Sequence, residues 1–371
     1  MKEERGQFDQ LFNRRHERPG DVFMELLEKE KLVVAPGVYD AMGAHIAQEI
    51  YRQRKRNSLS CNFNAVYLGG WSISDMLLRK PDMGFVPLSV MEMVGRYVIP
   101  EAYPLPVIMD AETGFGTEVT LGETVETYHR IGVALAHLED QDSNLTRRCG
   151  NLGGKQCVEP EKMAAKIRSW LIVSKSIGTS MRLMARTDAL TAVNGGIEDA
   201  IERGKRYMDT DYQGLRPAVL WADAMMHPKD IEKWTTELHK HDPKMILGLN
   251  YSPNKDWTGY YRKHFNQYPP TYETLYNNGD GFRVIWHTIL QARADMEAAW
   301  NTFQDMAKNG AESLWKLHER QRHHPVGDTQ AMSNAKPWQA YEQLIGGEEA
   351  IKRYQNSEGY GAGSSQQKDQ A

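Results

Sequence analysis

Acidic side chains directly follow several apolar segments of the chain. Asp110 and Glu112 follow the segment 107–109, and Glu139 follows the segment 134–138. Carboxylates that gather at one point repel one another unless a cation lies among them. Hard oxygen ligands without an accompanying histidine or thiolate cluster favour Mg2+ over zinc, with Mn2+ as its substitute. On the residues alone, the alternative is a set of salt bridges at the rim of the fold.

A second candidate for chemistry is the segment 147–155, which is rich in glycine and cationic residues and is centred on Cys149. The charges of Arg147, Arg148 and Lys155 favour a thiolate, so Cys149 could exchange a proton at neutral pH. A buried structural cysteine is the alternative, because cysteines outside disulfides are often buried. Cys157 follows at a spacing that is not typical of zinc sites, and we expect it in the core.

Eight short apolar segments must position these side chains. They are residues 32–35, 65–68, 107–109, 134–138, 182–185, 218–221, 245–249 and 282–285. Amphipathic segments with helical spacing lie between many of them, at 121–131, 160–173, 196–207 and 228–239. Apolar strands that alternate with helices are typical of a parallel sheet covered by helices. Eight such units in roughly 250 residues predict an α/β fold, a closed (β/α)8 TIM barrel whose catalytic groups gather at the carboxyl ends of the strands.

An open, doubly wound sheet is the competing fold. It usually has a glycine-rich phosphate turn after its first strand, and residues 35–39 do not have that pattern. The predicted catalytic barrel covers residues 31–290. Residues 1–30 are predicted to form an N-terminal helical extension, packed outside the barrel. Residues 291–356 are predicted to form C-terminal helices, with a break at Asn309-Gly310, and residues 357–371 a disordered tail rich in Gly, Ser and Gln.

Composition excludes several classes of partner. The chain has 371 residues, with 45 Lys and Arg against 49 Asp and Glu, and its net charge of -4 gives no pull toward nucleic acid or membrane. No apolar run is long enough to cross a bilayer. Three cysteines in a long chain argue for a reducing compartment rather than a disulfide framework. We therefore expect a cytoplasmic protein that binds a small molecule.

Six motifs occur in order along the predicted barrel. They are Tyr67-Leu68-Gly69-Gly70-Trp71, Pro81-Asp82, Asp110-Ala111-Glu112-Thr113-Gly114-Phe115-Gly116, Glu139-Asp140-Gln141 with Arg148-Cys149-Gly150 and Gly154-Lys155, Ala185-Arg186-Thr187-Asp188, and Asn250-Tyr251-Ser252-Pro253 with Trp257. They resemble the YLSGW, P-D, DAEAGFG, EDQ…KKCGHxGGK, ARTD and NCSPSFNW segments of isocitrate lyases. Each motif is weak alone, but together they make the chain similar to the isocitrate lyase/phosphoenolpyruvate mutase superfamily.

The resemblance implies a set of roles for the matching positions. Members bind Mg2+ through carboxylates, here Asp82, Asp110, Glu112 and Glu139. Contacts to the 2-oxo acid product match Gly69, Gly70, Trp71 and Arg186. The second-carboxylate pocket matches Gly150, Asn250 and Ser252. Cys149 matches the proton donor of the lyases, and Tyr67 is a candidate base, with a nearby carboxylate as its rival. Members are usually homotetramers and often exchange the last barrel helix.

These roles imply a magnesium-dependent oxo-acid lyase. Its substrate would be a 2-hydroxy di- or tricarboxylic acid resembling isocitrate, methylisocitrate or an alkylmalate. Its products would be a 2-oxo acid, such as glyoxylate or pyruvate, and a carboxylic acid, such as succinate. A hydrolase of a 2-oxo diacid, a phosphonate-forming isomerase and a non-catalytic barrel are the alternatives. Cys149 weighs against the isomerase, because the mutases commonly lack this cysteine.

Five positions depart from the family pattern. Asn151 replaces a histidine, Asn254 a serine, Trp286 a threonine, Asp223 a glutamate and Gly69 a serine. Most of them are predicted to line the pocket for the succinate-like half of the substrate. A tryptophan in place of a small residue changes the volume of a pocket enough to exclude a substrate. The sequence therefore argues against isocitrate as the best substrate and favours a related 2-alkylmalate or substituted isocitrate.

Overall fold

The computed structural model describes residues 11–12, 14–150 and 152–355. The chain divides into two compact units. One comprises Arg15–Arg293, and the other comprises Met1–Arg14 together with Ala294–Ala371. The first unit contains all eight strands of the sheet and every residue that lines the candidate active site.

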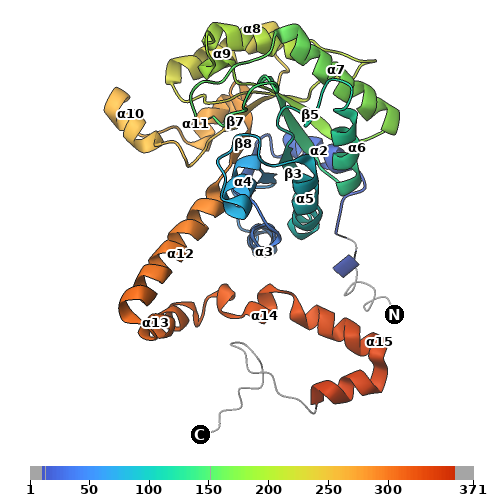
Figure 1. Ribbon diagram of the computed structural model, residues 1–371, viewed down its shortest axis with the longest axis vertical. Helices are drawn as coiled ribbons and strands as arrows, with labels where there is room; N and C mark the ends of the chain where they lie inside the picture. Colours follow the sequence, from blue (N-terminus) through green and yellow to red (C-terminus); the bar gives the residue numbers. More distant parts are fainter. Residues whose placement is uncertain (1–10, 13, 151, 356–371) are drawn as a thin grey trace. The chain divides into compact units, whose positions relative to one another are not determined.

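The first unit is a closed barrel of eight parallel strands in sequence order (Figure 1). The strands are β1 (Val33–Val38), β2 (Val66–Leu68), β3 (Val107–Asp110), β4 (Leu135–Glu139), β5 (Arg182–Thr187), β6 (Val219–Ala222), β7 (Leu247–Asn250) and β8 (Phe282–His287). Strand β1 pairs with both β2 and β8, which closes the sheet. Each strand overlaps one predicted apolar segment, and the predicted (β/α)8 barrel is confirmed.

Helices connect the strands along the outside of this barrel. They are α3 (Ala41–Arg56), α4 (Gly70–Leu78), α5 (Leu88–Ala102), α6 (Gly122–Ile131), α7 (Pro160–Ile177), α8 (Ile197–Met208), α9 (Pro228–His241), α10 (Trp257–Phe265) and α11 (Tyr272–Tyr276), with short 3-10 turns at Ala189–Thr191 and Asn277–Gly279. Local signals set their ends. Asp40 caps α3 by accepting a 2.7 Å hydrogen bond from the Gly43 N–H. Helix α6 stops at Gly132, whose φ of 89° is the left-handed conformation that glycine adopts most easily.

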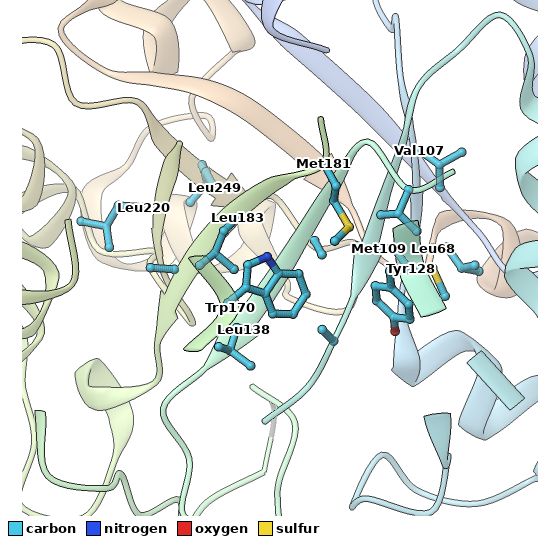
Figure 2. Close-up of a cluster of buried hydrophobic side chains, with 14 of the residues drawn as sticks. Leu68, Val107, Met109, Tyr128, Leu138, Trp170, Met181, Leu183, Leu220 and Leu249 are labelled. Atoms are coloured by element: carbon cyan, nitrogen blue, oxygen red, sulfur yellow. The ribbon is translucent and has the colours of Figure 1, made fainter. Parts of the chain in front are cut away.

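Two hydrophobic layers hold the barrel together. The outer layer lies between strands and helices, where Trp170 of α7 packs close to Leu138 and Leu183 (Figure 2). The inner layer fills the barrel itself with side chains such as Met184 and Trp221. Side chains alternate between these two layers along each strand, because successive residues of a strand point to opposite faces.

The N-terminal helix α2 (Pro19–Lys29) closes the end of the barrel at which the strands begin. Phe23 and Leu27 are fully buried and belong to the inner layer. A Cβ on Gly20 would lie 1.8 Å from the Ser180 carbonyl oxygen, so the helix and the start of β5 approach as closely as only glycine permits. The predicted N-terminal extension therefore supplies part of the barrel core.

The second unit is helical. It contains most of α12 (Leu290–Asn309), α13 (Glu312–Gln321), α14 (Thr329–Met332) and α15 (Ala335–Gln355), with a 3-10 turn at Pro325–Gly327. Gly310, with a φ of 56°, separates α12 from α13 at the expected break. The predicted disordered tail begins at residue 357 and lies outside the described residues. Among the helices that are described, none combines the length and the apolarity needed to span a bilayer.

Candidate active site

A cavity lies where the barrel strands end, and it contains about 480 Å³ of space including its open mouth. It is lined by Tyr67, Gly69, Trp71, Asp82, Asp110, Cys149, Gly150, Arg186, Trp221, Asp223, Asn250, Ser252, Lys255, Thr288 and Ile289. Most of the predicted substrate and catalytic residues therefore share one cavity.

Four carboxylates lie together on one side of this cavity, which we call the acidic side: Asp82, Asp110, Glu112 and Glu139. Each of the four residues is at most 6% exposed. The guanidinium of Arg147 links three of them, because it pairs with Asp82, lies 2.8 Å from Glu112 Oε2 and lies 3.6 Å from Glu139 Oε1. The structure thus brings the predicted metal residues together, and it shows a cation among them that sequence reasoning assigned only to the cysteine loop.

The backbone around these carboxylates is unusual. Glu112 has a φ of 47°, which is uncommon for a residue other than glycine and often marks a functional site. Its N–H donates a 2.8 Å hydrogen bond to Asp110 Oδ1, and the Gly70 N–H donates a 3.0 Å bond to Asp110 Oδ2. These two bonds fix the orientation of the Asp110 carboxylate. Gly70 thus orients a carboxylate, although it does not line the cavity.

The charges on the acidic side are strongly perturbed. Burial raises the pKa of Glu139 to about 8, although Arg186 and Arg147 lower it. Burial also raises the pKa of Glu112, against the effect of Arg147. Burial opposes the ionisation of Asp110 as well, but nearby His137, Arg147 and Arg186 bring its pKa below the ordinary value. The pKa of Asp110 is therefore lowered, whereas the pKa values of Glu112 and Glu139 stay raised despite the nearby arginines.

The four carboxylates supply the type of oxygen donor that a hard divalent cation prefers, but they are not arranged as a ligand group in the described structure. Both oxygens of Glu139 lack a well-aligned hydrogen bond among the described residues, although guanidinium groups lie nearby. A Cβ on Gly70 would lie 2.8 Å from Glu112 Oε1 and 3.1 Å from Asp110 Oδ2, so the glycine keeps the space beside these oxygens open. Within the described part of the chain, no three acidic, histidine or cysteine side chains converge as a ligand group, and Arg147 lies among the acids.

Arg186 connects the acidic side to the opposite wall. From the end of β5, its Nη1 lies 2.8 Å from Glu139 Oε2, and its Nε lies 2.9 Å from Asp188 Oδ2. Its guanidinium also stacks 4.2 Å from the ring centre of Trp221. Lys155 joins the same network, 3.0 Å from Asp188 and 3.1 Å from Asp223. Both cations are therefore held in place before any ligand binds.

Tyr67 does not have the properties of a general base. It is 1% exposed, and its hydroxyl lies 2.8 Å from His137 Nε2. Burial, with the negative charge of Asp110, raises the pKa of Tyr67 well above its ordinary value. Burial also lowers the pKa of His137 to about 4, so the imidazole is neutral and cannot assist by its charge. The phenol therefore stays protonated at neutral pH, which favours the rival carboxylate as the base.

Cys149 lies over the cavity on a loop tied to the acidic side. Its N–H donates a 3.2 Å hydrogen bond to the Asp82 carbonyl oxygen. Gln141 holds the neighbouring residue, because its side chain exchanges two 2.8 Å hydrogen bonds with the Arg148 backbone. Cys149 is 8% exposed, so it is buried yet lines the cavity that Asp110 lines. Asn151, two residues after Cys149, lies outside the described residues.

The far wall of the cavity is built from the ends of β7 and β8, and we call it the distal side. Asn250, Ser252 and Thr288 line it, and the Thr288 hydroxyl lies 3.3 Å from Asn250 Oδ1 and 3.1 Å from Ser252 Oγ. Asn254 does not line the cavity; its side chain is exposed, and its N–H donates to Ser252 Oγ.

The predicted position of Trp286 is wrong. This side chain is fully buried inside the barrel, with its ring centre 4.8 Å from that of Trp221 and 5.8 Å from that of Tyr67. The prediction failed because β8 continues to His287, two residues beyond the apolar segment that marked its end. Thr288, and not Trp286, is the residue after β8 that lines the cavity.

Sequence reasoning also missed Lys255, which lines the distal side. Its ammonium nitrogen is buried and has no hydrogen-bond partner among the described residues. A signal was present in the motif comparison, because Lys255 occupies the position of the phenylalanine in NCSPSFNW.

Comparisons with known proteins agree with the barrel. A family model described as phosphoenolpyruvate phosphomutase matches residues 23–223. The isocitrate lyase of Haloferax volcanii is 29% identical over 339 residues, which make up 91% of this chain and 89% of that protein. The 2,3-dimethylmalate lyase of Eubacterium barkeri is 40% identical over 186 residues, 50% of this chain and 58% of that protein. A solved structure of oxaloacetate acetylhydrolase with the inhibitor 3,3-difluorooxalacetate has a TM-score of 0.64 at 26% identity, and the match covers 79% of this chain and 87% of that one.

Proposed function

Because the chain belongs to the phosphoenolpyruvate phosphomutase family, we propose that it cleaves a carbon–carbon bond in a 2-hydroxy di- or tricarboxylic acid. Membership confirms the resemblance found in the six motifs. The observation that supports a lyase most strongly is the placement of Cys149 in the same cavity as Asp110 and Arg186. The cavity can therefore hold the hydroxyl-bearing carbon of a substrate, with Arg186 binding its carboxylate and Cys149 donating a proton.

The substrate would bind with its 2-hydroxy-carboxylate end against Arg186, whose guanidinium is charged and fixed in place. Beside it, Gly69 and Trp71 line the cavity and Gly70 orients Asp110. We propose that Asp82, Asp110, Glu112 and Glu139 hold Mg2+, with Mn2+ as its substitute. When bound, this ion would stabilise negative charge that develops on the oxygens of the 2-hydroxy acid.

The reaction then needs two proton transfers. We propose that Asp110, the cavity-lining carboxylate kept ionised by nearby positive groups, takes the proton of the 2-hydroxyl. The electron pair of that O–H bond forms the carbonyl of the 2-oxo acid while the neighbouring C–C bond breaks. The electron pair of the C–C bond stays on the carbon beside the second carboxylate. Cys149 protonates this carbon, and the sulfur later regains a proton from solvent or Asp110.

A hydrolase of a 2-oxo diacid is the second candidate. The likeness to oxaloacetate acetylhydrolase favours it, because this relative shares the barrel at 26% identity. The two reactions differ in their products. A lyase yields one 2-oxo acid per substrate, whereas a hydrolase consumes water and oxaloacetate and yields two carboxylic acids.

The test is product release from a panel of 2-hydroxy diacids and triacids, with oxaloacetate included, in Mg2+ and in EDTA. We expect glyoxylate or pyruvate to form from at least one hydroxy acid and only with the cation. Oxalate formation from oxaloacetate alone would replace the lyase by the hydrolase. No turnover of the whole panel would leave a non-catalytic barrel and overturn the proposal.

The setting of the enzyme is also part of the proposal. We propose a homotetramer in the cytoplasm, in which the helix after β8 is exchanged between neighbours. The family resemblance supports the assembly, and the sparse cysteines, which form no disulfide within the described residues, support a reducing compartment. Light scattering of the purified chain checks the assembly.

A further inference from the structure

Among the described residues, the distal side of the cavity contains a buried cation that has neither a hydrogen bond nor a close ion pair. Lys255 Nζ is shielded from solvent, donates no hydrogen bond and has no carboxylate within ion-pair distance among the described residues. By contrast, Arg186 pairs with Glu139 and Asp188. Lys155, a buried lysine that does not line the cavity, pairs with Asp188 and Asp223. The carboxylates nearest the cavity are thus already used by other cations.

The backbone fixes where Lys255 stands. Its N–H donates a 3.2 Å hydrogen bond to the Ser252 carbonyl oxygen, which also accepts a 3.0 Å bond from Trp257 Nε1. Directly after Lys255, Asp256 caps α10 by accepting a 2.8 Å bond from the Gly259 N–H. Trp257 is itself buried and stacks on Tyr251 at 4.3 Å between ring centres. Hydrogen bonds of the backbone before and after Lys255 therefore hold this residue in a fixed position.

A buried ammonium without a partner is costly, because it has lost its water and gained no anion. Burial lowers the pKa of Lys255, and the positive charges of Lys155 and Arg186 act in the same direction, whereas Asp223 and Asp188 raise it. Such a group persists most readily where a ligand supplies the missing negative charge. The polar groups beside it, Asn250, Ser252 and Thr288, can complete the hydrogen bonds of a carboxylate.

We infer that Lys255 is a specificity-determining residue, which binds the carboxylate of the fragment that leaves as the carbanion. This inference rests on the proposed lyase function and names the distal group of its substrate. A hydroxy acid with a neutral or apolar distal group would leave the ammonium unpaired, and the site would reject it. The substrate class is therefore a 2-hydroxy acid with an anionic group at each end.

The test uses two binding probes that need no turnover, titrated by calorimetry in Mg2+. Succinate probes the distal side, and oxalate probes the side of Arg186. In Lys255→Met, we expect succinate to bind at least about tenfold more weakly and oxalate to bind as before. Lys255→Arg should retain most of the succinate affinity. Lys263→Met, at an exposed position of the helix α10 that follows Lys255, is the matched control and should change neither.

Thermal unfolding without ligand separates ligand recognition from a structural role. Removing an unpaired buried charge should raise the Tm of Lys255→Met, whereas removing a structural ion pair would lower it. Unchanged succinate affinity in Lys255→Met, or a lowered Tm together with weaker binding of both probes, would overturn the inference while the lyase assay still judges the proposed function. If the unmodified enzyme binds neither probe and turns over no substrate, the proposed function fails and the inference fails with it.

Discussion

The acidic and distal sides of the cavity have opposite arrangements of charge. On the acidic side, four buried carboxylates meet the guanidinium groups of Arg147 and Arg186, so the charges are partly balanced within the protein. On the distal side, polar groups surround Lys255, whose ammonium has no partner in the described residues. A cation that bound the acidic side would have to rearrange the ion pairs there, whereas an anion could bind beside Lys255 without breaking an ion pair.

The two sides would therefore differ in how much of a ligand's binding energy is offset by broken ion pairs of the protein. An ion that entered the acidic side would displace or repel Arg147, so part of its interaction energy would offset the loss of the protein's own ion pairs. Arg147 and Cys149 belong to one loop, and the Cys149 N–H is hydrogen-bonded to Asp82, which is itself an Arg147 partner. The position of the proposed proton donor is thus linked to the charge balance of the acidic side.

The largest effect is expected from Cys149→Ser, at the boundary between the two sides. Serine is a much weaker acid than cysteine, so kcat should fall by about 10²–10⁴-fold, the usual contribution of a positioned acid. Calorimetry with oxalate should show nearly unchanged binding, because the thiol is not assigned to that end of the substrate. Full turnover of the variant would remove the thiol from the mechanism.

Arg186→Gln should break the link between the acidic side and its substrate. The change removes the nearer of the two cations beside Glu139 and leaves Asp188 with Lys155 alone, and a bound carboxylate loses its ion pair. Truncating one member of such a buried pair costs roughly 2–5 kcal/mol, so oxalate affinity should fall by at least about 30-fold. Lowered thermal stability should accompany it. Retained oxalate affinity would place the 2-oxo acid elsewhere.

Arg147→Met tests whether the acidic side resists its own cation. The guanidinium lies within 4 Å of three carboxylates, and two charges at this distance interact by about 4 kcal/mol at an effective dielectric of 20. Its removal should tighten Mg2+ binding at least about tenfold in calorimetry. The Mg2+-free variant should unfold at a lower temperature, because the acids lose their partner. Weaker Mg2+ binding would instead make Arg147 an organiser of the site.

His137→Gln should give the smallest effect, seen in the pH dependence of stability. Because the folded pKa of His137 is about 4 rather than 6.5, the unfolded chain binds the extra proton between these pH values. Stability is therefore lost as pH falls from 6.5 toward 4. Urea unfolding of the variant should show a shallower loss, by on the order of 1 kcal/mol per pH unit. Parallel curves for both proteins would mean that His137 is not buried as a neutral group.

The fold and the acidic side could be predicted because both follow from local pattern. Apolar strands that end in Asp110, Glu139 and Arg186 predict a barrel and indicate the end of it where catalytic groups gather. Trp286 was misplaced because the end of β8 is set by pairing with β1 and β7, which the strand's own composition does not reveal. The state of Tyr67 depends on complete burial beside Asp110, and the lone charge of Lys255 depends on which cations had already paired with nearby acids. Such properties arise only when distant segments meet.

The most direct test is the stoichiometry of products from a cleaved 2-hydroxy diacid in Mg2+, measured in D2O by mass spectrometry. A lyase in which Cys149 delivers the proton should give one 2-oxo acid for each carboxylic acid, and the carboxylic acid should carry one deuterium at the carbon freed by the cleavage. Cys149→Ser should make both products slowly and in the same ratio. The assignment as a cation-dependent lyase would be contradicted by two carboxylic acids from oxaloacetate with no 2-oxo acid, or by products that form equally well in EDTA.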